Sequence, residues 1–326
     1  MSVLVTGGAG YIGSHMTYAL LERGEDVVVL DNLSTGSRSL VAEKAAFVEG
    51  DVGDRDLVVR LIEEHRIDAV IHFAGSIVVP DSVSDPLTYY ANNTVNSRSL
   101  IEATVQGGVG NFIFSSTATV YAGQSAEPLI ETMQTGPMSP YGRSKLMTEW
   151  MLEDAARAHG LRSVVLRYFN VAGADPKGRT GQISPRATHL IKRASQAALG
   201  RIPHLDIFGT DYPTADGTGV RDYIHVSDLV SAHALALNYL RAGGESTVMN
   251  CGYGHGASVR EVIAATERVT GHVLPVREGP RRAGDPPWLI AESSRIRALL
   301  GWQPEHDDLE EIVRTAWQWE SRLNAS

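Results

Sequence analysis

The stretch Gly7-Gly8-Ala9-Gly10-Tyr11-Ile12-Gly13 directly follows a short apolar run and opens an amphipathic segment. In a strand–turn–helix unit, glycines spaced as Gly7, Gly10 and Gly13 permit a tight turn, close approach of the backbone to a pyrophosphate, and close packing of helix on strand. The N-terminus of the following helix presents free N–H groups to the phosphates. The stretch therefore predicts a dinucleotide-binding turn, although a glycine pattern without this context equally fits a plain turn.

Apolar runs typical of buried strands alternate with amphipathic helical patterns through the first half of the chain. The strand-like runs cover residues 3–5, 27–30, 47–48, 69–73, 112–114 and 164–166, and the helical patterns cover residues 12–23, 56–65, 88–106 and 140–159. Such alternation is typical of parallel βαβ units with helices on both faces of a sheet. We therefore predict an α/β fold with a Rossmann-like, doubly wound parallel sheet.

The pattern changes after Asn170, where Pro, Gly and charged residues crowd residues 173–185. We expect a first domain over residues 1–170 that binds the dinucleotide. A smaller C-terminal α/β lobe over residues 171–326 would bind the substrate. Residues 222–240 are expected to form one more strand and helix that join the first domain.

Composition limits the partners and the compartment. The 326 residues carry a net charge of -9, which argues against a broad surface for nucleic acid or anionic membranes. The single cysteine, Cys251, rules out an intramolecular disulfide and a thiolate zinc cluster, and it fits a reducing compartment. No basic leader precedes the first strand, and no apolar run approaches about 18 residues. We expect no metal and a cytoplasmic location.

The carboxyl ends of the next predicted strands offer further cofactor contacts. Asp31 ends the second strand at the spacing where a carboxylate binds ribose hydroxyls and repels a 2′-phosphate, so NAD is favoured over NADP. The alternative is a solvated aspartate at a strand end. Asp51-Val52 and Phe73-Ala74-Gly75 follow the third and fourth strands, where small residues let a cofactor approach; their alternative is an ordinary loop. His72 fits a structural role better than a catalytic one.

A proton-transfer pair is predicted at the start of the helix over residues 140–159. Ser139 fits the N-cap, so Tyr141 lies in the first turn and Lys145 lies one turn later on the same face. Tyrosine has an ordinary pKa of about 10, and ionising it near pH 7 costs ~4 kcal/mol. The lysine ammonium, the helix N-terminus and oxidised nicotinamide could jointly supply that energy. Taken alone, the spacing fits an exposed i, i+4 pair better.

Hydroxyl side chains end the fifth predicted strand, in Ser115-Ser116-Thr117. The carboxyl end of a central strand faces the crevice of such a fold, so these hydroxyls should lie opposite Tyr141. A threonine hydroxyl both donates and accepts, which suits a proton relay. We assign this role to Thr117, with Ser115 and Ser116 as secondary candidates. Some of these hydroxyls must act only as strand-end caps.

These residues, together with Tyr168-Phe169-Asn170, the block 211–226 and Arg281-Arg282-Ala283-Gly284-Asp285, closely resemble the UDP-glucose 4-epimerase family of the extended short-chain dehydrogenase/reductases. The likeness covers nearly the whole chain, and the block 211–226 has no generic structural explanation. The resemblance implies tightly held NAD and interconversion of UDP-glucose and UDP-galactose. It also implies a homodimer formed through the helices over residues 88–106 and 140–159.

In the mechanism that the resemblance implies, Tyr141 as a phenolate takes the proton of the sugar 4-hydroxyl while hydride passes from C4 to NAD. The resulting 4-keto sugar turns over in the site and receives the hydride on its other face. Thr117 assists the proton transfer, and Lys145 lowers the pKa of Tyr141 and holds the nicotinamide ribose. The implied cofactor contacts are Gly7, Gly10, Tyr11, Ile12, Gly13, Asp31, Asn32, Asp51, Val52, Phe73, Ala74, Gly75, Asn92, Ser115, Tyr141, Lys145 and Tyr168.

The resemblance also implies contacts to the nucleotide and the sugar. These come from Thr117, Tyr141, Asn170, His189, Leu190, Phe208, Arg221, Tyr223, Arg282, Asp285 and Leu289. Arg221 and Arg282 suit a pyrophosphate, although solvated surface charge is the alternative for each. Phe208 offers a flat face, and Asp285 can accept from ribose. Leu289 occupies the position where relatives limit bulk at the sugar 2-position, and its intermediate size predicts slow epimerisation of the N-acetylated sugar.

Some positions in this sequence differ from the patterns of related families, and these positions help to choose among the alternative functions. The apolar run 76–80 stands where some relatives carry a cofactor-binding lysine, which puts one contact in doubt. A 4,6-dehydratase needs an added acid and base directly after the threonine, and Ala118-Thr119 supplies neither. A UDP-glucuronate decarboxylase usually shows a glutamate there and a basic residue for the carboxylate, and neither is evident. The alternative from another class is a non-catalytic NAD sensor, but such proteins commonly lose the tyrosine or the lysine.

Overall fold

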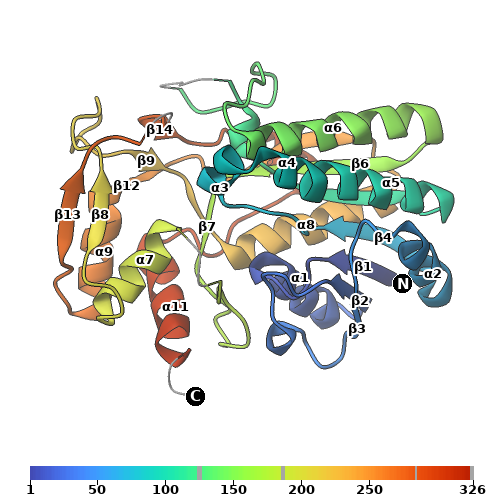
Figure 1. Ribbon diagram of the computed structural model, residues 1–326, viewed down its shortest axis with the longest axis horizontal. Helices are drawn as coiled ribbons and strands as arrows, with labels where there is room; N and C mark the ends of the chain where they lie inside the picture. The colour runs from blue at the N-terminus through green and yellow to red at the C-terminus, as the bar shows by residue number, and fades with distance from the viewer. Residues whose placement is uncertain (123–126, 185–187, 283–284, 324–326) are drawn as a thin grey trace.

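A seven-stranded parallel sheet forms the centre of the larger part of the molecule (Figure 1). The computed structural model describes residues 1–122, 127–184, 188–282 and 285–323. Strands follow the order β11-β6-β5-β4-β1-β2-β3, so the chain winds outward in both directions from the boundary between β1 and β4. This confirms the predicted doubly wound sheet, in which ligands bind at the carboxyl ends beside the switch point. The strands are β1 (Ser2–Thr6), β2 (Asp26–Asp31), β3 (Ala46–Glu49), β4 (Ile67–His72), β5 (Asn111–Thr117), β6 (Arg162–Tyr168) and β11 (Thr247–Cys251).

Alternate residues of each strand face opposite helical layers, which explains the continuous apolar runs in the sequence. Val3 packs with the helices of the first layer, and Leu4 packs with those of the second. The first layer is α1 (Tyr11–Glu22) and α8 (Val226–Arg241), and the second is α2 (Arg55–His65), α5 (Asn96–Gln106) and α6 (Pro140–His159). Both faces of the sheet are therefore covered, and ligands of such folds bind at the carboxyl edge.

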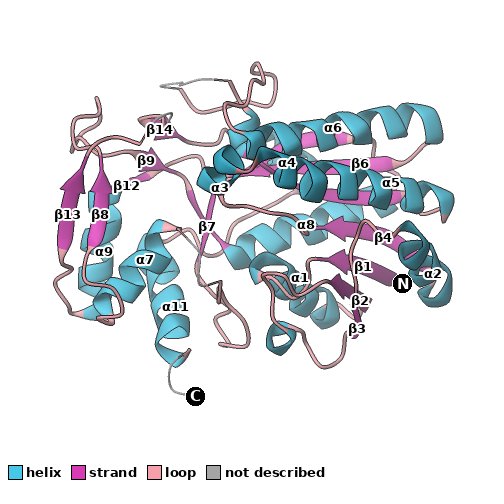
Figure 2. Ribbon diagram, in the orientation of Figure 1, coloured by secondary structure: helices cyan, strands magenta, loops and turns pink. Residues whose placement is uncertain are grey.

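Three small sheets and a group of helices lie beside the carboxyl ends of the large sheet (Figure 2). Strand β7 pairs with β10, β8 pairs with β13, and β9 lies between β12 and β14. Helices α7, α9 and α11 pack on one another. The bounds are β7 (Asn170–Ala172), α7 (Leu190–Ala198), β8 (Leu205–Phe208), β9 (Val220–Arg221), β10 (Tyr223–His225), β12 (Ala257–Ser258), α9 (Val259–Thr270), β13 (Val276–Gly279), β14 (Trp288–Leu289), α10 (Ser294–Leu300) and α11 (Leu309–Arg322).

The helix predicted over residues 88–106 is divided in the structure. A short helix α3 (Val79–Ser84) precedes α4 (Pro86–Tyr89), and a π-helical turn η2 (Tyr90–Val95) then leads into α5. The wider turn carries Asn93, which is buried and accepts from the Ser76 amide at 2.7 Å. π turns commonly occur at functional sites, and this one lies at the carboxyl edge of the sheet.

Residues 222–251 link the two parts of the molecule. Strand β10 pairs with β7, whereas helix α8 packs on β5 and β6 of the large sheet. Helix α8 then serves as the crossover to β11, the seventh strand, which we did not predict from the sequence. The division into domains 1–170 and 171–326 stays a prediction. Two single-turn helices, η1 (Arg38–Leu40) and η3 (Ala118–Val120), complete the described elements.

Among the described residues, no helix combines the length and the apolarity needed to cross a membrane.

Candidate active site

The glycine-rich turn between β1 and α1 has almost no room for side chains. Gly7 has a φ of +71°, and a Cβ there would lie 2.6 Å from the backbone nitrogen of Ala74. A Cβ on Gly13 would lie 2.2 Å from the carbonyl oxygen of Gly7. The turn therefore lies directly against the segment of Ala74, and both positions require glycine, as the tight turn of a dinucleotide-binding unit does.

Helix α1 begins with backbone donors that no side chain caps. Gly10 is the N-cap and has no side-chain hydrogen bond to the first turn. The first amide groups of a helix have no partner within it and lie at the positive end of the helix dipole. Tyr11, Ile12 and Gly13 therefore fit the phosphates of a dinucleotide. Tyr11 is fixed there because its hydroxyl donates to the Gly173 carbonyl at 2.6 Å.

Asp31 closes β2 next to the glycine-rich turn. It is buried and accepts from the amide groups of Ala9 at 2.9 Å and Leu33 at 2.8 Å. A carboxylate has about four acceptor positions, so Asp31 can still accept from ribose hydroxyls. Asp31 therefore also has a structural role, because its carboxylate accepts from the Leu33 amide and holds the loop that follows β2.

A chain of polar side chains joins three predicted cofactor contacts. Asp51 accepts from Asn32 Nδ2 at 2.8 Å and from Asn96 Nδ2 at 2.9 Å. Asn96 also donates to Asn92 Oδ1 at 3.5 Å. The side chain of Val52, in contrast, packs into the apolar core under the sheet, so only its backbone is available to a ligand.

The segment after β4 lies next to the lysine of the predicted proton-transfer pair. A Cβ on Gly75 would lie 3.8 Å from Lys145 Nζ. Phe73 contacts the ring of His233 with 4.9 Å between centroids. His72 is structural, as expected: its ring nitrogens hydrogen-bond Thr6 Oγ1 at 2.7 Å and Ser97 Oγ at 2.8 Å.

Tyr141 and Thr117 meet where α6 begins and β5 ends. Ser139 is the N-cap of α6, and its hydroxyl accepts from the Gly142 amide at 3.1 Å, as the sequence predicts. The helix thereby places Tyr141 beside the Thr117 side chain, and both residues are buried. Burial raises the pKa of Tyr141 to about 12, although the Thr117 hydrogen bond acts to lower it. These two residues alone do not produce a phenolate at neutral pH.

Lys145 lies one turn further along α6 and is also buried. Its ammonium donates to the Ser115 carbonyl at 3.0 Å and lies 4.8 Å from the centre of the Phe114 ring. Burial lowers the pKa of Lys145 to about 8, and the charge of Glu149 opposes this shift. At pH 7 an ammonium with this pKa is mostly protonated, and its charge is held next to the carboxyl end of β5.

Ser115 and Tyr168 belong to a second hydrogen-bonded group on the other face of β5. His233 Nδ1 lies 2.9 Å from the Leu229 carbonyl, so this nitrogen carries the proton. His233 Nε2 then accepts from the Ser115 hydroxyl at 2.9 Å. Ser115 also hydrogen-bonds Tyr168. Burial lowers the pKa of His233 to about 4, so the imidazole stays neutral and fixes the direction of these bonds.

Several predicted substrate contacts lie on the small strands that face the end of β5. Asn170 on β7 hydrogen-bonds the Tyr223 side chain on β10, and Tyr223 is buried. Arg221 on β9 lies opposite Leu289 on β14. Leu289 packs against the cluster that contains Ala118, the residue directly after Thr117. The strand pairing therefore brings Leu289 close to the proposed reacting end of the site.

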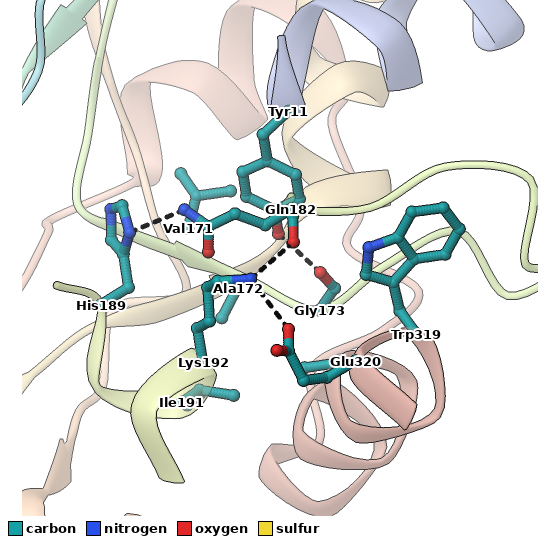
Figure 3. Close-up of a pocket in the computed structure, with 11 residues that line it drawn as sticks. Tyr11, Val171, Ala172, Gly173, Gln182, His189, Ile191, Lys192, Trp319 and Glu320 are labelled. Atoms are coloured by element: carbon teal, nitrogen blue, oxygen red, sulfur yellow. Dashed lines mark hydrogen bonds and ion pairs between the residues drawn. The ribbon is translucent and has the colours of Figure 1, made fainter. Parts of the chain in front are cut away.

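His189 and Leu190 begin α7 beside a small cavity of about 20 Å³ (Figure 3). Tyr11 and Lys192 also line it. His189 Nδ1 lies 2.9 Å from Gln182 Nε2, and burial lowers the pKa of His189. The cavity is large enough for one water molecule and too small for a nucleotide. The cavity lies where α1 meets α7. Helix α1 carries predicted cofactor contacts, and the start of α7 carries predicted nucleotide contacts.

Phe208, Arg282 and Asp285 form the outer part of the predicted nucleotide site. The Arg282 guanidinium lies 3.9 Å from the centre of the Phe208 ring. It is exposed to solvent, and the Asp285 amide donates to its carbonyl at 3.3 Å. One face of the Phe208 ring is thus covered by the Arg282 guanidinium. Residues 283–284 of the same motif lie outside the described residues.

Sequence reasoning missed two buried groups at the site. One is His233, which lies 118 residues from its partner Ser115, and no local pattern indicates this contact. The other is the ion pair of Glu149 and Arg167. A signal for this pair was present, because Arg167 interrupts an apolar strand and Glu149 lies four residues after Lys145. Among the described residues, no group of three or more His, Cys, Asp or Glu is placed to hold a metal ion.

The chain belongs to the NAD dependent epimerase/dehydratase family, whose model matches residues 3–252. The UDP-glucose 4-epimerase of Azospirillum brasilense is 59% identical over 324 residues, which cover 99% of this chain and 93% of the relative. The crystal structure of UDP-glucose 4-epimerase from Brucella ovis in complex with NAD superposes with a TM-score of 0.95 at 46% identity and covers 98% of both chains. UDP-glucose-4-epimerase from Stenotrophomonas maltophila, with bound NAD and formylated UDP-arabinopyranose, gives a TM-score of 0.96 at 42% identity and covers 100% of this chain and 99% of that one.

Proposed function

We propose that the protein is a UDP-glucose 4-epimerase, which interconverts UDP-glucose and UDP-galactose with bound NAD. The observation that carries this proposal is the placement of buried Tyr141 at the start of α6 beside buried Thr117 at the end of β5, with Lys145 one turn away. The glycine-rich turn and its uncapped helix lie at the same edge of the sheet. The full-length similarity to UDP-glucose 4-epimerases supports the same activity.

In this reaction Tyr141 accepts the proton of the sugar 4-hydroxyl and later returns it. Thr117 hydrogen-bonds the Tyr141 hydroxyl and passes the proton between it and the sugar. Bound NAD would supply the reversible acceptor for the hydride of sugar C4, and a positive charge beside the phenolate. Since burial raises the pKa of Tyr141 to about 12, the charge of Lys145 is also required to stabilise the phenolate.

The remaining predicted contacts fall into two groups, one for the nucleotide part of the substrate and one for the sugar. Arg221 and Arg282 neutralise the pyrophosphate, and Asp285 accepts from the ribose of the nucleotide. Asn170 and Tyr223 lie opposite each other in the pairing of β7 with β10. Leu289 contacts the cluster at Ala118 and limits the space at the sugar 2-position.

The structure disfavours a dehydratase. Elimination of water needs an acid and a base directly after Thr117. Ala118 is buried in an apolar cluster and supplies neither group. The Thr119 hydroxyl is 3.1 Å from that of Thr117, and the Thr119 amide donates to the Thr117 hydroxyl at 3.2 Å, so Thr117 caps the turn that follows β5. No carboxylate stands at either position.

We further propose that the protein forms a homodimer in the cytoplasm. Large apolar side chains are exposed on neighbouring elements α3, α4, η2 and α6, in the upper layer of Figure 1: Val83, Leu87, Val95 and Trp150. Leu87 is 77% exposed and Trp150 is 53% exposed. Apolar residues gathered in this way mark an interaction surface, and a second copy would cover them. The lone, buried Cys251 is compatible with a reducing compartment.

Incubation with UDP-galactose alone tests the proposed activity. We expect UDP-glucose to form without added reductant and without release of stoichiometric NADH. Incubation with UDP-glucose should reach the same ratio of products from the opposite direction. A 4-keto-6-deoxy sugar would identify a dehydratase instead. No conversion in either direction, by protein whose absorbance shows bound nicotinamide, would favour the sensor alternative.

A further inference from the structure

A buried ion pair lies behind the proton-transfer residues, and the mechanism above does not use it. Arg167 on β6 donates to Glu149 on α6, from Nη2 at 2.6 Å and from Nε at 3.1 Å. The two side chains are 6% and 5% exposed. Burying two charges costs more than an apolar pair of similar volume would. The position of this pair, directly behind Lys145, suggests a role beyond stability.

Glu149 is the third member of a series on one face of α6. Tyr141, Lys145 and Glu149 follow one another at intervals of four residues, so their side chains project in one direction. Each lies at the end of β5: Tyr141 lies beside Thr117, Lys145 donates to the Ser115 carbonyl and Glu149 accepts from the Ser116 hydroxyl. The two hydrogen bonds therefore set the position of the helix along the strand.

The pair also sets the charge around Lys145. Burial lowers the pKa of Lys145 to about 8, and Glu149 opposes this shift. Burial likewise acts to lower the pKa of Arg167, but its hydrogen bonds and charge contact with Glu149 raise the pKa above the ordinary value. Arg167 lies opposite Ser116 in the sheet register and 4.9 Å from the centre of the Tyr121 ring, so the guanidinium is fixed.

We propose that Glu149, held by Arg167 and Ser116, is a positioning residue that fixes α6 against β5 and keeps Lys145 charged beside Tyr141. This inference rests on the proposed function for the identity of the proton that Tyr141 moves. Glu149 itself touches neither the sugar nor the cofactor in this scheme and acts only through Lys145 and Tyr141.

Other titratable groups act on this series and on the ion pair from outside α6. His72 on β4 acts on Lys145, Tyr89 on α4 and Tyr168 on β6 act on Tyr141, and Tyr121, directly after η3, contacts Arg167. Burial, with a smaller effect from Lys145, lowers the pKa of His72 to about 3. Burial raises the pKa of Tyr168 above its ordinary value. Neither group changes charge in the neutral range, so neither mimics a change at Glu149.

Glu149→Gln tests the proposal because glutamine keeps the size and can still accept from Ser116, but carries no charge. Loss of a buried negative charge lowers the pKa of an ammonium and also lowers the pKa of a phenol. The acid limb of the pH–turnover profile reports Tyr141, and the basic limb reports Lys145. Both limbs should therefore move to lower pH, by roughly one unit. If the two limbs of the pH–turnover profile stay at the same pH and only the maximum turnover rate falls, the proposal is wrong.

Two matched variants define the effect. Glu149→Asp keeps the charge and should restore a profile within a few tenths of a unit of the wild type. Glu25→Gln removes the charge from another ion pair, in which Glu25 accepts from Arg241 near the opposite edge of the sheet. It should leave the profile in place. Lys145→Met should move the acid limb to higher pH, opposite to Glu149→Gln, because the phenolate loses a positive neighbour.

A second measurement needs no turnover and so separates this inference from the proposed function. The tyrosinate absorbance of Tyr141 is obtained by subtracting the titration of the matching Tyr141→Phe protein. In the Glu149→Gln background Tyr141 should ionise at lower pH, and an unchanged midpoint counts against the proposal. If Glu149→Gln fails to fold, the double variant Glu149→Gln/Arg167→Met removes the unpaired cation. Both shifts should then keep their direction and be smaller, because loss of the Arg167 charge opposes loss of the closer Glu149 charge.

Discussion

The two ends of the candidate site are built differently. At the proton-transfer end, Tyr141, Lys145 and Thr117 are buried on a long helix and a central strand, and each bonds a neighbour across the helix–sheet interface. At the nucleotide end, Arg282 is exposed in a loop and its guanidinium rests on the Phe208 ring. The first end resembles a protein core, and the second resembles a surface that a ligand completes.

This difference follows from what each end has to do. Shifting the pKa of a tyrosine requires fixed charges in a medium of low dielectric constant, which only buried and regular elements supply. Binding and releasing a pyrophosphate requires charges that can exchange water for phosphate, which exposed arginines on loops do well. Substitutions at the first end should therefore change turnover and its pH dependence, and substitutions at the second should change affinity.

The largest effect is expected from Tyr141→Phe. Loss of general acid–base catalysis should lower kcat by about 10²-fold or more. UDP affinity, measured by calorimetry, should change little, because the phenol lies at the sugar end. Near-normal turnover in this variant would show that Tyr141 does not transfer the proton. The proposed difference between an end that controls turnover and an end that controls affinity would then be wrong.

A smaller effect, of the opposite kind, is expected from Arg282→Ala. Loss of charge-assisted hydrogen bonds to phosphate should weaken UDP binding by roughly 10- to 150-fold, which corresponds to about 1.5–3 kcal/mol. The kcat of the variant at saturating substrate should equal that of the wild type. The adjacent Arg281 is a matched control, because it is also exposed, pairs with Asp211 and lies 4.3 Å from the centre of the Tyr212 ring. Equal losses for Arg281→Ala and Arg282→Ala would mean that only general surface charge matters.

The smallest effect should appear between the two ends, at Leu289. Leu289→Tyr adds bulk beside the Ala118 cluster, where strain of about 1–3 kcal/mol corresponds to a roughly 5- to 150-fold loss in rate. We expect the wild type to epimerise UDP-N-acetylgalactosamine slowly and UDP-galactose faster, and the variant to lose only the slow activity. Rates with the two sugars measure this directly. Parallel losses on both sugars would show that Leu289 does not set the size limit.

Short-range patterns account for most of what the sequence predicted correctly. The glycine-rich turn, the Ser139 cap and the spacing of Tyr141 and Lys145 each depend on residues within one or two turns of the chain. The parallel sheet followed from the alternation of apolar runs and helical patterns. We did not predict strand β11 because its residues Thr247–Cys251 include polar positions. Its place beside β6 also depends on where α8 packs.

The sequence by itself determined the fold class, the glycine-rich turn between β1 and α1, and the placement of Tyr141 and Lys145 one turn apart on α6, because helix and strand periods and backbone sterics act locally. Only the tertiary structure decided how those residues are charged and held. Arg167 reaches Glu149 across 18 residues and His233 reaches Ser115 across 118, and neither contact exists until helices pack on both faces of the sheet. The low dielectric constant that makes these contacts matter is likewise a product of packing, and no local pattern in the sequence encodes it.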